Sequence, residues 1–273
     1  MVSLQNKAPA HFIDAYIAPR IEKGGKMNAL TAVLSFVIGY LAGGISFTRL
    51  VSRLVNADNS ITDVEIPMEG TDETYKMEAM GASTAAMVHG PKVGCTIGLL
   101  DMLKVFVPTL IFRLLYPDQP YMLICAVAGV IGHDWPIYHK FKGGRGISAV
   151  YGGLFAVDWL SAIISSSLGM FFGMVILKDF MFAYFAGLWF LIPVIWFVSR
   201  DPIYILYAVA MNILFTLAMV PDIRQIIRLR KKLGGKGSMD NMMNMVPMGR
   251  SMKKLGEKLR LVKKQPTQPA EDE

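Results

Sequence analysis

The chain has 273 residues, 53% of them hydrophobic, with a mean hydropathy of +0.41 and a net charge of +7. This hydropathy excludes an ordinary soluble domain, because the apolar residues also gather in long uncharged runs. The two cysteines, Cys95 and Cys125, both lie in apolar runs. They therefore indicate neither a disulfide framework nor a metal site.

Residues 1–26 are polar to mixed and contain no apolar core ahead of a cleavage site, which excludes an ordinary signal peptide. We expect this segment to be an N-terminal extension that is not essential to the membrane domain. Either the natural start is further along, at Met27, or the segment forms a short surface helix.

A transmembrane domain is predicted at 27–221, where apolar runs follow one another. At about 1.5 Å per residue, each run spans or nearly spans a hydrocarbon core about 30 Å thick. The stretch 147–177 is too long for one helix and carries Asp158 as its only charge, so we expect it to split there into a short and a full helix. The predicted fold is an all-α polytopic membrane protein of about seven transmembrane helices, drawn from the runs 28–48, 93–112, 119–138, 147–177, 180–199 and 202–221.

The polar segments differ sharply in charge. Segment 56–80 is predicted to be an acidic loop, with seven Asp and Glu residues against Lys76 alone. Segment 222–273 holds thirteen Lys and Arg against six acidic residues, which predicts a cytoplasmic tail under the positive-inside rule. Its last part is either a basic amphipathic helix on the membrane surface or a poorly ordered solubilising tail. A nucleic-acid-binding tail is the rival interpretation, which the adjoining membrane domain disfavours.

Asp101 and Lys104 are three residues apart in the second predicted span, so they lie on one face of a helix. A charge at the bilayer centre costs about 2.5–3.5 kcal/mol, so both side chains should face the bundle interior. Either the pair only neutralises itself and locks helices together, or Lys104 is a cation placed near an anionic substrate.

A glycine-rich basic turn follows the third predicted span, whose end carries His133. Glycines allow backbone N–H groups to converge on an anion, and two cations add to the attraction. The alternative is an ordinary positive-inside turn, with His133 as a capping or packing residue. No nucleotide phosphate-loop, Ser-His-Asp, Cys-His or zinc spacing is present, so we expect no metal. The candidate anion site is Lys142, Gly143, Gly144, Arg145 and Gly146.

These motifs resemble the PlsY family, the bacterial membrane acyltransferases that use acyl-phosphate to acylate glycerol 3-phosphate. The resemblance covers residues 35–230. Residues 132–146 match the family pattern GHxxP…FKGGKG, with Arg145 in place of a lysine, and residues 101–104 match the start of DxxKG. Shorter likenesses lie at 43–45 and 81–94.

Other positions depart from the family pattern. The GSGN element expected before Gly81 is missing. Thr84 replaces an asparagine, and Met87 replaces an arginine that holds phosphate in the family. In the last motif, RHxxN, Asp222 stands at the histidine position and Gln225 at the asparagine position.

The resemblance implies that a hydroxyl of glycerol 3-phosphate attacks the carbonyl of acyl-phosphate, giving lysophosphatidic acid and phosphate for phospholipid biosynthesis. It implies no cofactor, membrane lipids as the surroundings, and a place in the cell inner (cytoplasmic) membrane with the site facing the cytoplasm. The site residues that it implies are His133 and Lys104 as catalytic groups and 142–146 as the phosphate cradle, with Asp101, Arg224 and Arg228 as further candidates.

The replaced motif positions leave other hypotheses open. One is a catalytically degenerate relative that binds a phosphorylated lipid precursor or regulates an active acyltransferase. Another is an anion transporter, which predicts paired discontinuous helices and internal symmetry; the sequence shows neither.

Overall fold

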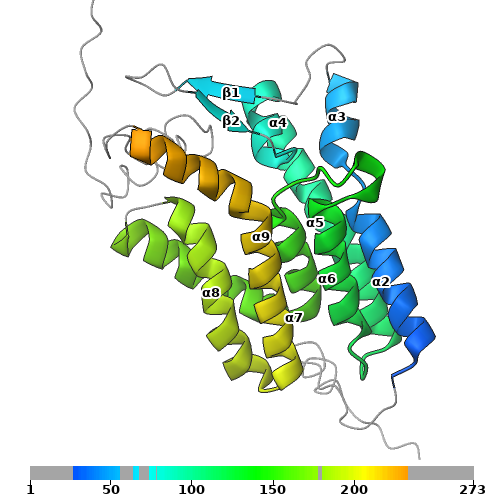
Figure 1. The fold of residues 1–273 in the computed structure, drawn as a ribbon. Coiled ribbons are helices and arrows are strands. Elements are labelled where there is room, and N and C mark those ends of the chain that lie inside the picture. Colours follow the sequence, from blue (N-terminus) through cyan, green and yellow to red (C-terminus); the bar gives the residue numbers. More distant parts are fainter. Residues whose placement is uncertain (1–26, 56–63, 68–73, 78, 178–179, 233–273) are drawn as a thin grey trace, which may run out of the picture.

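The computed structural model describes residues 27–55, 64–67, 74–77, 79–177 and 180–232. This part of the chain forms a helical bundle with a small sheet and short helices at one end (Figure 1). In chain order the elements are α2 (Ala29–Gly43), α3 (Phe47–Val55), β1 (Val64–Pro67), β2 (Thr74–Met77), α4 (Ala82–His89), α5 (Pro91–Leu115), α6 (Tyr121–Asp134), a 3₁₀ turn (Ile137–His139), α7 (Ile147–Phe171), a π-helical turn (Phe172–Ile176), α8 (Phe180–Ser199) and α9 (Pro202–Lys232).

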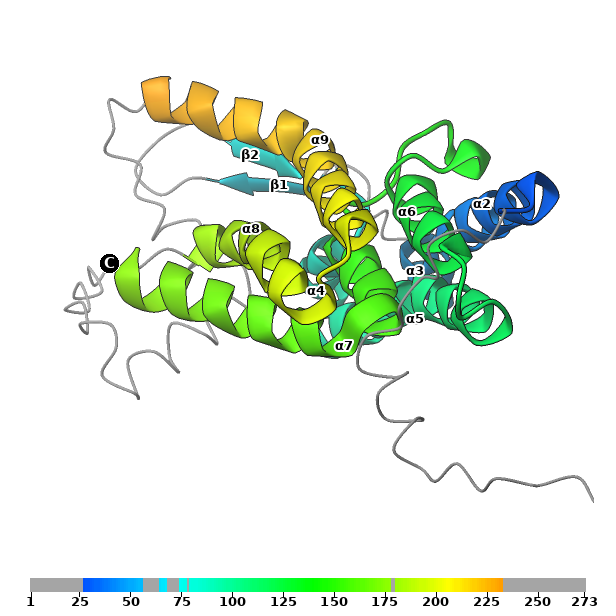
Figure 2. The ribbon, with the colours of Figure 1, turned by 90° about the horizontal axis from the view of Figure 1, so that it is seen from below.

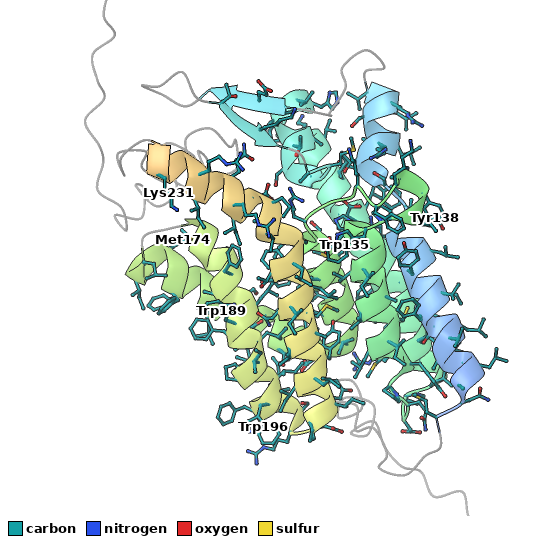
Figure 3. All side chains as sticks on the ribbon, in the orientation of Figure 1. Trp135, Tyr138, Met174, Trp189, Trp196 and Lys231 are labelled. Atoms are coloured by element: carbon teal, nitrogen blue, oxygen red, sulfur yellow. The ribbon has the colours of Figure 1, made fainter. Side chains whose placement is uncertain are left out.

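Among the described residues, four helical stretches are long and apolar enough to cross a membrane, and a shorter apolar helix covers Phe185–Ser199. Large apolar side chains cover the outside of the bundle. On α8, for example, Trp189 and Trp196 point outward and are 66% and 44% exposed (Figure 3). Apolar surface on this scale requires lipid around it. The predicted helical membrane architecture is confirmed, apart from the small sheet.

α7 breaks at Asp158, whose backbone leaves the helical region at φ −155° and ψ 90°. The Asp158 carboxylate caps the second half of the helix by accepting bonds from the Ser161 N–H at 3.0 Å and the Ser161 hydroxyl at 2.6 Å. The Arg113 guanidinium of α5 caps the first half by donating to the carbonyls of Ala156 and Val157 at 2.7 and 3.2 Å. The predicted split near Asp158 is confirmed. With it, α2, α5, α6, the two parts of α7, α8 and α9 supply the seven apolar segments expected.

Three predicted boundaries are wrong. The first helix ends at Gly43 rather than near Thr48, and a separate helix, α3, begins at Phe47. The segment 56–80 is not only a loop, because Val64–Pro67 and Thr74–Met77 pair as antiparallel strands. Finally, the last helix, α9, does not end near Pro221 but continues to Lys232. A proline removes one helical hydrogen bond and kinks a helix, but need not end it. The predicted extension 1–26 and the tail beyond residue 232 lie outside the described residues.

The end view separates the bundle into two parts (Figure 2). α8 packs beside α7, whereas α2, α5 and α6 lie together on the opposite side. The loop that follows α6, the helix α3 and the β1–β2 hairpin gather at one end, where the candidate site residues lie (Figure 1).

Glycines bring α2 and α6 into unusually close contact. A Cβ atom at Gly43 would overlap the carbonyl of Gly129, and one at Gly132 would overlap the carbonyl of Tyr40. Gly39 and Gly43 form a small-xxx-small pair, the pattern that lets two membrane helices approach at backbone distance. This contact fixes the position of the α2 end beside the end of α6.

We expect Gly43→Ala to destabilise the protein by about 1–3 kcal/mol, because the added methyl group must push apart two backbones that cannot move independently. Thermal unfolding in detergent measures the loss. Gly98→Ala is the matched control, since a Cβ there would meet its nearest atom at an ordinary 3.4 Å. Equal unfolding temperatures for the two variants would contradict the close-contact interpretation.

Candidate functional site

Five of the predicted site residues, Asp101 among them, line one small cleft at the loop end of the bundle. Lys104 comes from α5, His133 from the end of α6, and Gly143 and Gly144 from the loop between α6 and α7. The break between α2 and α3 closes the opposite wall. The cleft is narrow: a water-sized sphere finds only about 10 Å³ of room for its centre between the lining atoms. The structure thus brings Lys104 and His133 together with Gly143 and Gly144 of the glycine turn.

The Lys104 ammonium lies at the centre of this cleft and is 8% exposed. Its Nζ donates to the carbonyl oxygen of Ile45 at 2.7 Å and pairs with Asp101 Oδ1, also at 2.7 Å. It lies 6.0 Å from the centre of the Phe47 ring. An ammonium has three N–H donors, so this arrangement leaves one for a ligand.

His133 holds the glycine turn in place through both its carbonyl and its imidazole ring. Its carbonyl accepts a hydrogen bond from the Gly144 N–H at 3.1 Å, and its imidazole packs against Gly144 so closely that a Cβ there would overlap Nε2. The same imidazole ring also approaches α5, where its Nδ1 lies 3.8 Å from Asp101 Oδ1. Only glycine fits at position 144 while this histidine is present.

Two of the backbone N–H groups that we expected to bind an anion already donate hydrogen bonds within the protein. The Lys142 N–H donates to the His139 carbonyl at 3.1 Å, and the Gly144 N–H is bonded to His133 as above. The Gly143 carbonyl accepts from the Met80 N–H at 3.3 Å, which ties the loop to the segment before α4. The amides of Lys142 and Gly144 are therefore engaged inside the protein, and the predicted cradle is narrower than the whole 142–146 turn.

Arg145 is paired with an acid of α9. Its Nε donates to Asp222 Oδ2 and its Nη2 to Asp222 Oδ1 at 2.9 Å, a two-bond guanidinium–carboxylate contact. Asp222 occupies the position at which the resemblance places a histidine. The arginine predicted to hold phosphate is thus held by a carboxylate of the same chain.

Asp134, next to the cleft residue His133, is a buried carboxylate that the sequence analysis did not single out. It is 3% exposed, and neither carboxylate oxygen has a hydrogen-bond partner in the described structure. A Cβ at Gly146 would lie 2.8 Å from either oxygen, so the carboxylate points at the start of α7. No motif marks it, because its place in the family pattern is a variable one.

Two other candidates lie elsewhere. Arg224 and Arg228 are exposed on α9 and do not line the cleft. The α9 residue that reaches the hairpin is Gln225, whose side-chain amide, oriented to match its partners, donates to the Lys76 carbonyl at 2.9 Å and accepts from the Lys76 N–H at 2.7 Å. This geometry gives Arg224 and Arg228 no place in the lining of the cleft.

Arg49 is a second residue that the sequence analysis did not place at the site. A cation that follows an apolar run is usually an anchor at the membrane surface. Instead the Arg49 Nη2 donates to the Lys142 carbonyl at 3.3 Å, next to Gly143 in the cleft wall. The signal that could have found it is its position four residues after Ile45, which ends the likeness to the family pattern at 43–45.

A metal centre is not formed by the residues that the structure describes, since no three His, Cys, Asp or Glu side chains there are grouped closely enough to hold an ion.

The fold and the cleft define a polytopic helical membrane protein with a buried ion pair, Asp101 and Lys104, at one end of its bundle. The sequence profile named glycerol-3-phosphate acyltransferase matches residues 33–231, most of the chain. The chain therefore belongs to the glycerol-3-phosphate acyltransferase family.

Curated relatives share this family name. The glycerol-3-phosphate acyltransferase of Thermotoga petrophila is 32% identical over 128 residues, which are 47% of this chain and 59% of the relative. That of Mycoplasma mycoides is 33% identical over 149 residues, 52% of this chain and 53% of the relative. The matches thus span between half and three-fifths of the length of these relatives.

Crystal structures of PlsY, an integral membrane glycerol 3-phosphate acyltransferase, share the fold. The lysophosphatidic acid form matches with a TM-score of 0.60 and 23% identity, and the match covers 73% of this chain and 93% of that one. The glycerol 3-phosphate form matches with the same TM-score at 21% identity and the same coverage.

We expect Arg145 and Asp222 to be energetically coupled. In a double-mutant cycle of Arg145→Ala and Asp222→Ala, the coupling energy should be about 1–3 kcal/mol, because the pair is bidentate and partly buried. Chemical or thermal unfolding of the four proteins measures it. Arg228→Ala, an exposed change on the same helix, should alter stability by less than about 0.5 kcal/mol. Additive effects of the two site substitutions would rule out the coupling.

Proposed function

We propose that the protein transfers an acyl group from acyl-phosphate to the hydroxyl of glycerol 3-phosphate, giving lysophosphatidic acid and inorganic phosphate. The observation that carries this proposal is the meeting of Lys104, His133 and the glycine turn in one cleft. Membership of the family adds support, as does the fold shared with PlsY, which has been crystallised in a lysophosphatidic acid form and a glycerol 3-phosphate form.

The chemistry needs little from the protein beyond positioning and charge. The hydroxyl oxygen of glycerol 3-phosphate attacks the carbonyl carbon of acyl-phosphate, and a new ester C–O bond forms. The bond between that carbon and the phosphate oxygen breaks, with its electron pair passing to phosphate. The hydroxyl proton goes to the departing phosphate, so no covalent enzyme intermediate and no cofactor are required.

Lys104 is the residue best placed to stabilise the charge that develops in this step. Its ammonium is buried and oriented by Asp101 and Ile45, so it needs no reorganisation when charge appears on the reacting oxygens. We assign His133 to positioning, because its ring and carbonyl both hold the Gly144 segment.

We place the protein in the cell inner membrane with the cleft facing the cytoplasm. Four basic residues of the described part lie at the end of the bundle that carries the cleft, as the positive-inside rule requires of a cytoplasmic face. They are Arg49, Arg53, Lys140 and Lys142.

A second candidate function has its own support. Arg145 is paired with Asp222, and Lys104 with Asp101, while Asp134 adds a further carboxylate. The inner site therefore carries no excess of positive charge to stabilise the reacting oxygens. This favours a relative without turnover, which binds a phosphorylated lipid precursor or regulates an active acyltransferase.

Purified protein supplied with acyl-phosphate and glycerol 3-phosphate should form lysophosphatidic acid and phosphate. Lys104→Met should lower kcat/KM by about 10²–10³-fold, because a preorganised donor to the developing charge is lost. Lys92→Met, at the exposed start of the same helix, is the matched control and should retain activity.

Removing Lys104 alone leaves Asp101 buried without its cation, which can unfold the protein. The double variant Asp101→Asn/Lys104→Met removes both charges and should fold yet remain inactive. Activity close to wild type in the folded double variant would exclude Lys104 as the catalytic cation. Saturable glycerol 3-phosphate binding by the wild type without acyl transfer would favour the second candidate.

A further inference from the structure

The cations around the cleft differ in how far their donors are already used. Lys104 is paired with Asp101, and Arg145 is bound through two bonds to Asp222. Each of these charges is largely balanced before a substrate arrives. A dianionic phosphate needs at least one cation that is not already paired.

Arg49 meets this need. Its Nη2 donates to the Lys142 carbonyl at 3.3 Å, and no carboxylate of the described chain pairs with it. Its Nε is buried and has no hydrogen-bond acceptor within the part of the chain that the structure describes. A guanidinium has five N–H donors in a planar fork that matches two phosphate oxygens, so most of this fork is available.

The position of Arg49 places this fork at the lip of the cleft. Ser46 and Thr48, just before it in the chain, line the cleft, as does Gly143, just after its hydrogen-bond partner Lys142. Figure 1 shows α3 standing beside the loop that follows α6, at the same end of the bundle as the cleft. The exposed Lys142 side chain adds a second cation at this lip.

The charge at the lip comes from arginine and lysine rather than from histidine. Burial, followed by the nearby charges of Arg49 and Arg53, lowers the pKa of His139 from its ordinary value. His139 is therefore neutral near pH 7 and does not compete with Arg49 for an anion.

We infer that Arg49, assisted by Lys142, binds the phosphate group of a substrate at the lip of the cleft, in place of the family arginine that Met87 replaces. This inference deepens the proposed function by naming a phosphate-binding residue of the same site. The same chemistry would recognise the phosphate of a soluble ester or of a lipid headgroup, so the test separates the two.

The test uses the full chain in nanodiscs of neutral phosphatidylcholine, with glycerol 3-phosphate as the titrant in isothermal calorimetry at fixed ionic strength. Arg49→Ala should raise Kd about tenfold or more, equivalent to about 1.4 kcal/mol. Arg53→Ala, one turn further along α3 and exposed, is the matched control and should change Kd less than about twofold because its charge is screened by solvent. Arg49→Lys should bind between the two, since lysine keeps the charge but not the fork.

Turnover adds a second readout. Arg49→Ala should raise KM for glycerol 3-phosphate about tenfold with kcat little changed, the pattern of a lost binding contact. Repeating the titration in nanodiscs containing phosphatidylglycerol tests the headgroup source. If the wild type then binds glycerol 3-phosphate as before, the site takes the soluble ester; if the anionic lipid competes only when Arg49 is present, the site takes the headgroup. Either result supports the inference.

Equal effects of Arg49→Ala and Arg53→Ala would overturn it, because a general electrostatic field would then explain the binding. So would unchanged binding in folded Arg49→Ala protein. The two proposals fail separately. If the wild type is inactive but its phosphate binding depends on Arg49, only the acyl-transfer proposal is refuted. If the wild type is active and its phosphate binding does not depend on Arg49, only the proposal that Arg49 binds phosphate is refuted.

Discussion

The buried Lys104 ammonium is the contact on which the geometry of the cleft depends. It joins α5 to the junction between α2 and α3 through the Ile45 carbonyl, and Asp101 extends the link toward His133 of α6. The Ile45 carbonyl is free to accept this bond because α2 ends at Gly43. In a continuous helix it would instead accept from the Arg49 N–H, which here faces the Ser46 hydroxyl at 3.4 Å. The helix break and the buried cation thus require each other.

Buried ion pairs add little to stability compared with well-packed apolar side chains, since desolvation offsets most of their attraction. The Asp101–Lys104 pair is therefore better explained by what it offers a ligand than by helix association alone. The glycine contact between α2 and α6 supplies the rigid frame, and it leaves the ammonium oriented before any substrate arrives. Preorganisation of this kind is the main source of electrostatic catalysis.

Two departures from the family pattern compensate each other. Asp222 stands where the family has a histidine, and Arg145 where it has a lysine, and together they form a planar two-bond pair that a lysine could not make. On the same helix, Gln225 holds the main chain of Lys76 in the hairpin. α9 thus holds both the loop after α6 and the β1–β2 hairpin through side-chain hydrogen bonds. In our proposal a cation elsewhere binds the phosphate, and Arg49 has open donors at the lip of the cleft.

The features that follow from local pattern could be predicted from the sequence. Apolar runs gave the helices, the lone Asp158 gave the break in α7, and the three-residue spacing of Asp101 and Lys104 gave their shared face. Features made by tertiary contact could not. Nothing near Arg145 in the chain points to Asp222, which lies 77 residues away, and the helix continuing past Pro221 is what brings that carboxylate to the loop.

The strands Val64–Pro67 and Thr74–Met77 were missed for a different reason. Each is only four residues long, and so short an alternation within a charged segment carries a weak strand signal. Arg49 was misjudged because a cation after an apolar run is usually an anchor at the membrane surface. Its contact with the loop depends on a helix break that the apolar pattern does not reveal.

The most direct measurement is a structure of the protein with glycerol 3-phosphate bound, in which the phosphorus position is seen. We expect the phosphate oxygens to lie within hydrogen-bonding distance of the Arg49 guanidinium, with the glycerol hydroxyls directed into the cleft toward Lys104. A phosphate bound instead on the exposed face of α9, at Arg224 or Arg228, with the cleft left without ligand, would contradict the central claim.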